Sequence, residues 1–189
     1  MSAWPDIKGW CADRDRTYLY DLIVARHART IVEVGVYAGR MTVALAAAAR
    51  ATGGMVHCVD HWREMANGGD IAREFLETLT AHDLQDVVRI YCEASATFAE
   101  RFLGAIDVLW IDGGHDKATV LCDLMGLGGR ATSVLGHDWH LPGVRDAAAE
   151  YAASHGFTVC NAAGTDNVWY LTAGNTAGKV PAMATGDGR

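Results

Sequence analysis

Acidic and histidine side chains follow several apolar runs in this sequence, and these residue types bind cations and move protons. Glu33, Asp60 and Asp112 stand at or just after the end of such a run, and the pair His137 and Asp138 follows another. A lone acid in such a place more often closes a turn or caps a helix. Acids at the ends of successive runs instead predict one shared rim where carboxylates and imidazoles meet.

The stretch TIVEVGVYAGR, residues 30–40, predicts a strand, a tight loop and the start of a helix. Gly35 can adopt a positive φ, and without side chains at Gly35 and Gly39 a ligand could lie on the backbone beside the positive end of the helix. The acidic side chain of Glu33 disfavours a phosphate. The glycine spacing points the same way, since a pyrophosphate cofactor calls for G-x-G-x-x-G whereas this loop reads E-x-G-x-x-x-G. The loop therefore favours a ligand with amino and hydroxyl donors, although a plain strand-to-helix turn would leave the same pattern.

Asp60 ends the next apolar run, MVHCVD, at the place where a dinucleotide fold carries the acid that binds ribose hydroxyls. We expect the same role for Asp60. His61 and Trp62 come next, and the indole of Trp62 would either cover an adenine face or pack in the core.

The elements that must position these residues alternate along the chain. Strands are predicted in runs that begin at residues 30 and 55 and over residues 87–91, 106–111 and 131–135. Helices are predicted from a cap at Asp13, from Met41, and over residues 69–82, 96–103, 116–125 and 144–154. This alternation predicts an α/β fold with a doubly wound, Rossmann-like parallel sheet, helices on both faces and ligands beyond the carboxyl ends of the strands.

The first helix carries Leu19, Leu22 and Ile23 at helical spacing, and this stripe is expected to pack on the edge of the sheet. Two further runs, residues 157–160 and 168–171, are separated by a short, turn-rich segment. Because so short a connection cannot cross over a sheet, the two runs predict an antiparallel pair.

Length and composition fit a single domain. The chain has 189 residues, half of them apolar, which is enough for one substantial core. We expect one domain over residues 1–173, with 1–11 as an irregular lead-in. Residues 174–189, rich in glycine and small side chains, are expected to form a disordered tail.

Charge and hydropathy exclude several classes of partner. The net charge of −7 argues against a nucleic-acid surface. The longest apolar run, residues 41–49, is too short to cross a membrane, and the N-terminal residues lack the pattern of a signal peptide, so we expect a cytoplasmic protein. The five cysteines are odd in number and show no C-x-x-C spacing, which favours reduced thiols.

Four segments together resemble a class I S-adenosylmethionine-dependent methyltransferase: EVGVYAG, VDHW, IDVLWIDGGHDKATVLCDL and GHDWHLPGV. More narrowly, they resemble the small-molecule family that includes macrolide-sugar and cephalosporin-modifying enzymes. The resemblance spans about residues 10–171 and implies a seven-stranded sheet, mostly parallel, with its last strand antiparallel. It also implies that Glu33, Gly35 and Gly39 line the methionine side of the cofactor, that Asp60 binds the ribose, and that Glu93, Ala94 and Ser95 border the adenine. The remaining residues predicted to bind the cofactor are Tyr37, His61, Trp62 and Asp112.

The same resemblance assigns the chemistry. In the sugar methyltransferases a D-x-x-H motif supplies one metal ligand and a general base, which here would be Asp112 and His115. Since neighbouring strands lie about 4.8 Å apart, Asp112 and Asp138 could converge on one divalent cation. The alternative is structural, with Asp112 closing a turn and His115 capping the following helix.

Three departures from the family pattern stand out. Metal-dependent members carry two adjacent acids where this chain has His137 before Asp138. A nitrogen ligand at His137 would favour a transition metal over Mg²⁺, unless His137 binds no metal. Lys117 and Ala118 also replace an aromatic residue and an acid that are common in relatives, and no long insertion encloses the acceptor, which implies an open site or a partner subunit in a homo-oligomer.

The sequence therefore predicts an O-methyltransferase for a small hydroxylated metabolite, with S-adenosylmethionine and a divalent cation, Mg²⁺ or a transition metal, and with His115 as general base. Two other classes stay open. One is a metal-independent N-methyltransferase or another transferase that uses the same cofactor. The other is a non-catalytic module that only binds the cofactor.

Overall fold

The computed structural model describes residues 4–63 and 68–173. The strands are β1 Thr30–Val34, β2 Met55–Val59, β3 Val88–Tyr91, β4 Ile106–Ile111, β5 Ala131–Gly136, β6 Phe157–Asn161 and β7 Trp169–Ala173. The helices are α1 Asp13–Arg26, α2 Arg40–Thr52, α3 Gly68–Ala81, α4 Ser95–Arg101, α5 Lys117–Leu127 and α6 Pro142–His155. The predicted alternation is confirmed, while the predicted tail, residues 174–189, lies outside the described residues.

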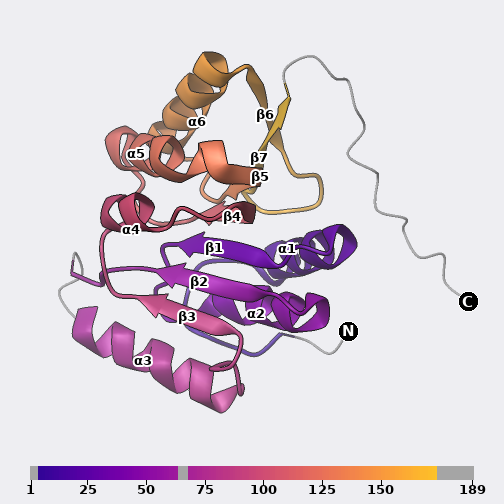
Figure 1. Ribbon diagram of the computed structural model, residues 1–189, viewed down its shortest axis with the longest axis vertical. Helices are drawn as coiled ribbons and strands as arrows, with labels where there is room; N and C mark the ends of the chain where they lie inside the picture. The colour runs from indigo at the N-terminus through magenta and orange to yellow at the C-terminus, as the bar shows by residue number, and fades with distance from the viewer. Residues whose placement is uncertain (1–3, 64–67, 174–189) are drawn as a thin grey trace, which may run out of the picture.

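All seven strands form one sheet in the order β3-β2-β1-β4-β5-β7-β6. Strands β1 to β5 pair in parallel, and β7 pairs antiparallel with both β5 and β6. Figure 1 shows β1, β2 and β3 pointing the same way, with α3 beside β3 at one end of the sheet. The predicted antiparallel pair is confirmed. Strand β7 lies between β5 and β6, so β6 forms the edge of the sheet.

Alternating side chains of the strands divide the core into two layers. On one face, Ile31, Val108 and Trp110 pack with apolar residues of α1, α2 and α3. On the other face, Val32 and Leu109 pack with residues of α4, α5 and α6. Burial of both faces is what the nearly continuous apolar strands require, and it leaves the ends of the strands as the place for polar chemistry.

The register of the central strands aligns the residues that follow them. Glu33 is opposite Trp110 and Val34 is opposite Ile111, which in turn is opposite Gly136. The ladder continues one step further, because the Asp112 N–H donates to Val34 O and the His137 N–H donates to Ile111 O, at 2.8 and 3.1 Å. The predicted shared rim therefore exists at the ends of β1, β4 and β5.

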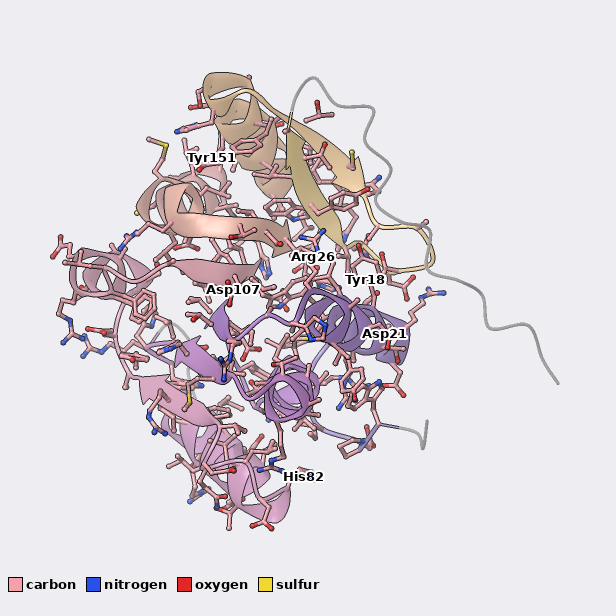
Figure 2. The ribbon with its side chains drawn as sticks, turned by 45° about the vertical axis from the view of Figure 1, so that its right-hand side comes forward. Tyr18, Asp21, Arg26, His82, Asp107 and Tyr151 are labelled. Carbon is pink, nitrogen blue, oxygen red and sulfur yellow. The ribbon has the colours of Figure 1, made fainter. Side chains whose placement is uncertain are left out.

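Helix α1 lies against the middle of the sheet, so the prediction that it packs on the sheet edge is wrong. Its residues Leu19 and Ile23 share a core cluster with Val108 of β4 and Leu135 of β5. Tyr18 and Arg26 on the same helix line a groove with residues of β5 and β7 (Figure 2). The apolar stripe of α1 is therefore buried together with α2 on the same face of the sheet.

The start of α1 also differs from expectation. Ala12, not Asp13, occupies the N-cap position. Its N–H donates to the carboxylate of Asp15 at 3.2 Å, which is one half of a capping box. The N-terminal turn of α1 lies at the carboxyl ends of the strands, where Asp15 contacts His137, whereas Arg26 at the other end of the helix hydrogen-bonds Ser133 inside β5.

Among the described residues, no helix combines the length and apolarity that a membrane span needs.

Candidate functional site

Glu33 is a buried carboxyl group at the end of β1, with 1% of its surface exposed. The Thr42 hydroxyl donates to its Oε2 at 2.7 Å and the Cys58 thiol at 3.3 Å. Burial raises the pKa of Glu33 to about 8, against the opposing effect of these two hydrogen bonds. A nearby positive charge favours the carboxylate form. Glu33 would therefore lose its proton when a cationic ligand binds beside it.

The two glycines of the loop both have positive φ, 84° at Gly35 and 90° at Gly39. A Cβ at Gly35 would stand 2.3 Å from the carbonyl oxygen of Asp112, and one at Gly39 would stand 2.8 Å from the ring of Phe75. The positive φ expected at Gly35 is confirmed, but the space beside each glycine is filled by protein. The glycines are thus required because the loop packs closely on α3 and on the residue that follows β4. The sequence predicted a different reason, namely that a ligand lies on the backbone where side chains are absent.

Asp60 holds the same loop through both of its oxygens. Oδ2 accepts the N–H groups of Val36 and Tyr37 at 2.9 and 3.1 Å, and Oδ1 accepts the N–H of Trp62 at 2.8 Å. Tyr37 and Trp62 both have positive φ, so these bonds fix a backbone that would otherwise be strained. A carboxylate has about four acceptor positions, which leaves capacity for the predicted ribose hydroxyls.

Trp62 packs in the core, which is one of the two alternatives predicted for its indole. Its indole is buried, stacks on Phe75 with ring centroids 5.6 Å apart, and donates to Tyr37 O at 2.9 Å. The neighbouring His61 accepts the N–H of Arg63 at its Nδ1. Tyr37 itself faces Trp10, whose ring is 4.9 Å away and largely exposed, so these two aromatic residues form an open apolar surface beside the loop.

The predicted adenine residues lie at the start of α4. Ala94 is the N-cap of that helix, and Ser95 donates a hydrogen bond to the buried Asp123 of α5. Glu93 forms an ion pair with Arg101 across the helix. These three residues therefore follow β3 at the same rim as the glycine loop.

The residues predicted to act in catalysis and metal binding lie close together beyond the ends of β4 and β5. Oxygen or nitrogen atoms of Asp112, His115 and Asp138 lie within 4.8 Å of one another. His115 Nε2 is 2.8 Å from Asp138 Oδ2. Asp116, not His115, caps α5, because it accepts the N–H of Thr119. The structural alternative for His115 as a helix cap is therefore wrong.

His137 lies beneath this cluster, with 6% of its side chain exposed. Its Nδ1 faces both carboxylates, 3.6 Å from Asp112 Oδ1 and 3.2 Å from Asp138 Oδ1. Its Nε2 points the other way, toward Asp15 Oδ2 at 3.4 Å. Sequence reasoning missed Asp15, because nothing in its spacing on α1 distinguishes it from an ordinary first-turn acid.

The charges of the cluster are strongly coupled. Burial raises the pKa of Asp112 to about 7, with His137 opposing the rise. Burial opposes a charge on His137, but the nearby carboxyl groups of Asp138, Asp15 and Asp112 outweigh it and raise its pKa to about 10. Burial likewise works against ionised Asp138, yet the two histidines hold its pKa well below the usual range.

This donor set fits a divalent cation. Two carboxylates at neighbouring strand ends provide oxygen ligands, and the Nδ1 atom of His137 lies within ligand reach of both. Asp112 and Asp138 are only partly buried, with 20% and 17% of their side chains exposed, so the site is open to an acceptor.

A family model described as a methyltransferase domain matches residues 32–139, which contain the glycine loop and the whole cluster. Among solved structures, cofactor-bound Rv0187 from MTB is 17% identical with a TM-score of 0.69, covering 92% of this chain and 84% of that chain. The O-methyltransferase TomG from Streptomyces achromogenes, involved in tomaymycin synthesis and solved with SAM, is 15% identical with a TM-score of 0.66, covering 88% and 81%. An O-methyltransferase from Bacillus cereus in complex with SAH is 19% identical with a TM-score of 0.65, covering 89% and 83%. At these identities the likeness concerns the fold.

Proposed function

The chain belongs to the methyltransferase-domain family and is an S-adenosylmethionine-dependent methyltransferase, and we propose that it methylates a hydroxyl oxygen of a small metabolite. The observation that carries this proposal is the convergence of Asp112, His115 and Asp138 at the ends of β4 and β5. An imidazole beside two carboxylates suits the removal of a proton from a hydroxyl group, a step that oxygen methylation needs.

On this proposal the cofactor lies across the ends of β1 and β2. Glu33 ionises toward its cationic methionine end, and Asp60 accepts ribose hydroxyls while it holds the loop of Val36 and Tyr37. Gly35, Gly39, His61 and Trp62 shape that loop, and Glu93, Ala94 and Ser95 border the adenine. S-adenosylmethionine supplies an electrophilic methyl group, and the protein must align the acceptor oxygen with it.

Asp112 and Asp138 would hold a divalent cation through oxygen, with His137 Nδ1 as a nitrogen ligand. When bound, such a cation would lower the pKa of the acceptor hydroxyl and fix its direction. On this proposal the aromatic pair of Tyr37 and the exposed Trp10, beside the glycine loop, is the apolar wall for a small acceptor.

His115 is proposed as the general base, and Asp138 sets its tautomer. Because Nε2 lies 2.8 Å from the Asp138 carboxylate, the ring proton of neutral His115 resides on Nε2 and Nδ1 carries the lone pair. The hydrogen bond to Asp138 also raises the pKa of His115 and so makes it a stronger base than a free imidazole. Its side chain is half exposed, as a base that meets an incoming acceptor requires.

A metal-independent transferase is the second candidate, and the charge of His137 favours it. With a pKa raised to about 10, the His137 imidazolium can itself neutralise Asp112 and Asp138 at neutral pH. Such an enzyme could methylate nitrogen, whose lone pair needs no activation by a metal.

The test combines binding and turnover on the full chain. Calorimetry should detect S-adenosylmethionine and not NAD, and transfer of a labelled methyl group to catechols, sugars and other small hydroxylated compounds should require a divalent cation. Loss of transfer in EDTA and its return with added cation would support the metal-assisted mechanism. Full transfer after exhaustive chelation would favour the second candidate, and binding of NAD alone would overturn both.

A further inference from the structure

Asp15 is a fully buried carboxylate of α1 that the proposed reaction leaves without a role. Its oxygens accept the N–H of Ala12 at 3.2 Å and the N–H of Asp166 at 2.6 Å, and the Cys11 thiol lies 3.9 Å away. These contacts come from the start of α1 and from the segment between β6 and β7. They fix the position of the carboxylate from two directions.

Within residues 4–63 and 68–173, the ion-pair contact of Asp15 is with His137. The next residue, Arg16, is also buried, but its Nη1 donates to Pro5 O and to Asp13. A buried carboxylate without a cationic partner is costly. His137 Nε2 lies 3.4 Å from Asp15 Oδ2 and has no hydrogen-bond partner among the described residues, so the two buried groups are paired by charge and not by a formed hydrogen bond. The fold thus supplies a fixed acceptor for one nitrogen of the imidazole.

The other nitrogen then faces the candidate metal site. With a proton on Nε2, the nitrogen on the Asp15 side, the lone pair of a neutral His137 is on Nδ1, which lies 3.6 Å from Asp112 Oδ1 and 3.2 Å from Asp138 Oδ1. A lone pair that close to two carboxylates is repelled by them unless a proton or a metal cation lies among the three, so a bound metal would take the place of the Nδ1 proton. Carboxylate, imidazole and metal in a row is the common way in which proteins orient a histidine ligand.

Resting on the proposed function, we infer that Asp15 is a positioning residue that holds His137 as a nitrogen ligand and makes the cation site select a transition metal ion over Mg²⁺. The physical reason is the donor set. Two carboxylates alone suit Mg²⁺, whereas an added imidazole favours ions such as Mn²⁺, Fe²⁺, Co²⁺ and Zn²⁺. Asp15 extends this selection to a residue on helix α1, whereas the proposed ligands follow strands β4 and β5.

The experiment compares Co²⁺ and Mg²⁺ affinities of the full-length, metal-free protein by calorimetry. The wild type should bind Co²⁺ more tightly than Mg²⁺. Asp15→Asn should weaken Co²⁺ binding roughly 10- to 100-fold, the usual loss when an outer partner of a ligand is removed, and should change Mg²⁺ binding little. The affinity ratio is the decisive readout, because a general loosening of the fold would weaken both ions.

Matched variants make the result interpretable. Asp13→Asn removes the same charge from the same helical turn, yet Asp13 pairs with Arg16 and Arg40 and not with His137, so the ratio should stay at the wild-type value. His137→Gln should lose the preference for Co²⁺ altogether. Proton NMR of the Co²⁺ complex should show an exchangeable, paramagnetically shifted ring N–H that is absent in His137→Gln.

Three outcomes separate this inference from the function on which it rests. A ratio that Asp15→Asn leaves unchanged, or a wild type that prefers Mg²⁺, overturns the role of Asp15 while metal-assisted methyl transfer stands. If the wild type binds no divalent cation, both the metal-assisted mechanism and this inference fail. If Asp15→Asn does not fold, the His137→Gln ratio and the shifted resonance decide.

Discussion

His115 and Asp138 are joined by a contact of 2.8 Å between Nε2 and Oδ2, although one residue follows β4 and the other follows β5. The contact orients an exposed imidazole over the end of the sheet and leaves its second nitrogen to accept a proton. Asp138 at the same time faces His137 from its other oxygen. One carboxylate thereby links the proposed base to the proposed metal ligand.

Replacing the proposed base should reduce the rate without reducing cofactor binding. A positioned base contributes on the order of 10² to 10⁴ in rate, so His115→Ala should lower kcat by about that factor. Calorimetry should find S-adenosylmethionine binding close to the wild-type value, because most of the proposed cofactor contacts come from the ends of β1, β2 and β3. His82→Ala, a histidine beyond the end of α3, is the control and should keep normal turnover. A His115→Ala enzyme with near-normal kcat would remove this residue from the chemistry.

The pH dependence of turnover should report the same imidazole. Because Asp138 raises the pKa of His115, the base is protonated up to a higher pH than free imidazole, and kcat should rise through an apparent pKa above 6.5. This acidic limb should be absent in His115→Ala, and added imidazole should restore part of the rate. A limb that persists unchanged in the variant would have to belong to another group.

Glu33 should make the cofactor-free protein less stable as the pH rises. Its pKa is about 8 in the folded chain and near 4.5 ordinarily, so the native state holds the proton more tightly than the unfolded state between these values. The free energy of unfolding should therefore fall from pH 5 to pH 8, on the order of 4 kcal/mol from this group by the linkage relation.

In Glu33→Gln this component is removed, because the amide does not titrate. Urea unfolding at several pH values should show the variant gaining stability relative to wild type as the pH rises, with most of the gain complete above pH 8. A difference between the two proteins that does not change with pH would contradict the buried, protonated state of Glu33.

A methyl group at Gly35 should damage the fold itself. Gly35→Ala would place a Cβ against the backbone of Asp112 at a residue with φ of 84°, so overpacking adds to backbone strain. We expect a loss of at least about 2 kcal/mol in the free energy of unfolding. The control is Gly156→Ala, which has φ of 73° but no atom within 4 Å of the added Cβ.

Gly156→Ala should lower the free energy of unfolding by roughly 1 kcal/mol, which is the strain of a side chain on a left-handed backbone. Urea titrations of both variants measure the difference. Equal losses in the two variants would mean that the approach of β4 to the glycine loop is not tight in solution.

The sequence by itself determined the order and type of the elements. Strands such as Ile106–Ile111 are buried on both faces and read as continuous apolar runs, while the helices show apolar stripes at helical spacing. Parallel strands then require that the acids at their carboxyl ends share one rim, so Glu33, Asp60, Asp112 and Asp138 could be expected near one another. The family resemblance added the antiparallel last strand and the chemistry.

Only the tertiary structure decided which atoms meet. Asp15 is distant from His137 in the sequence, and its contact depends on how α1 packs across β4 and β5 rather than on the sheet edge. The same packing directs one nitrogen of His137 toward α1 and the other toward the rim, and it places the backbone of Asp112 against Gly35. Periodicity fixes which side of a helix is buried, but long-range packing alone sets the direction of a buried polar side chain, because its partners come from elements that no local pattern connects.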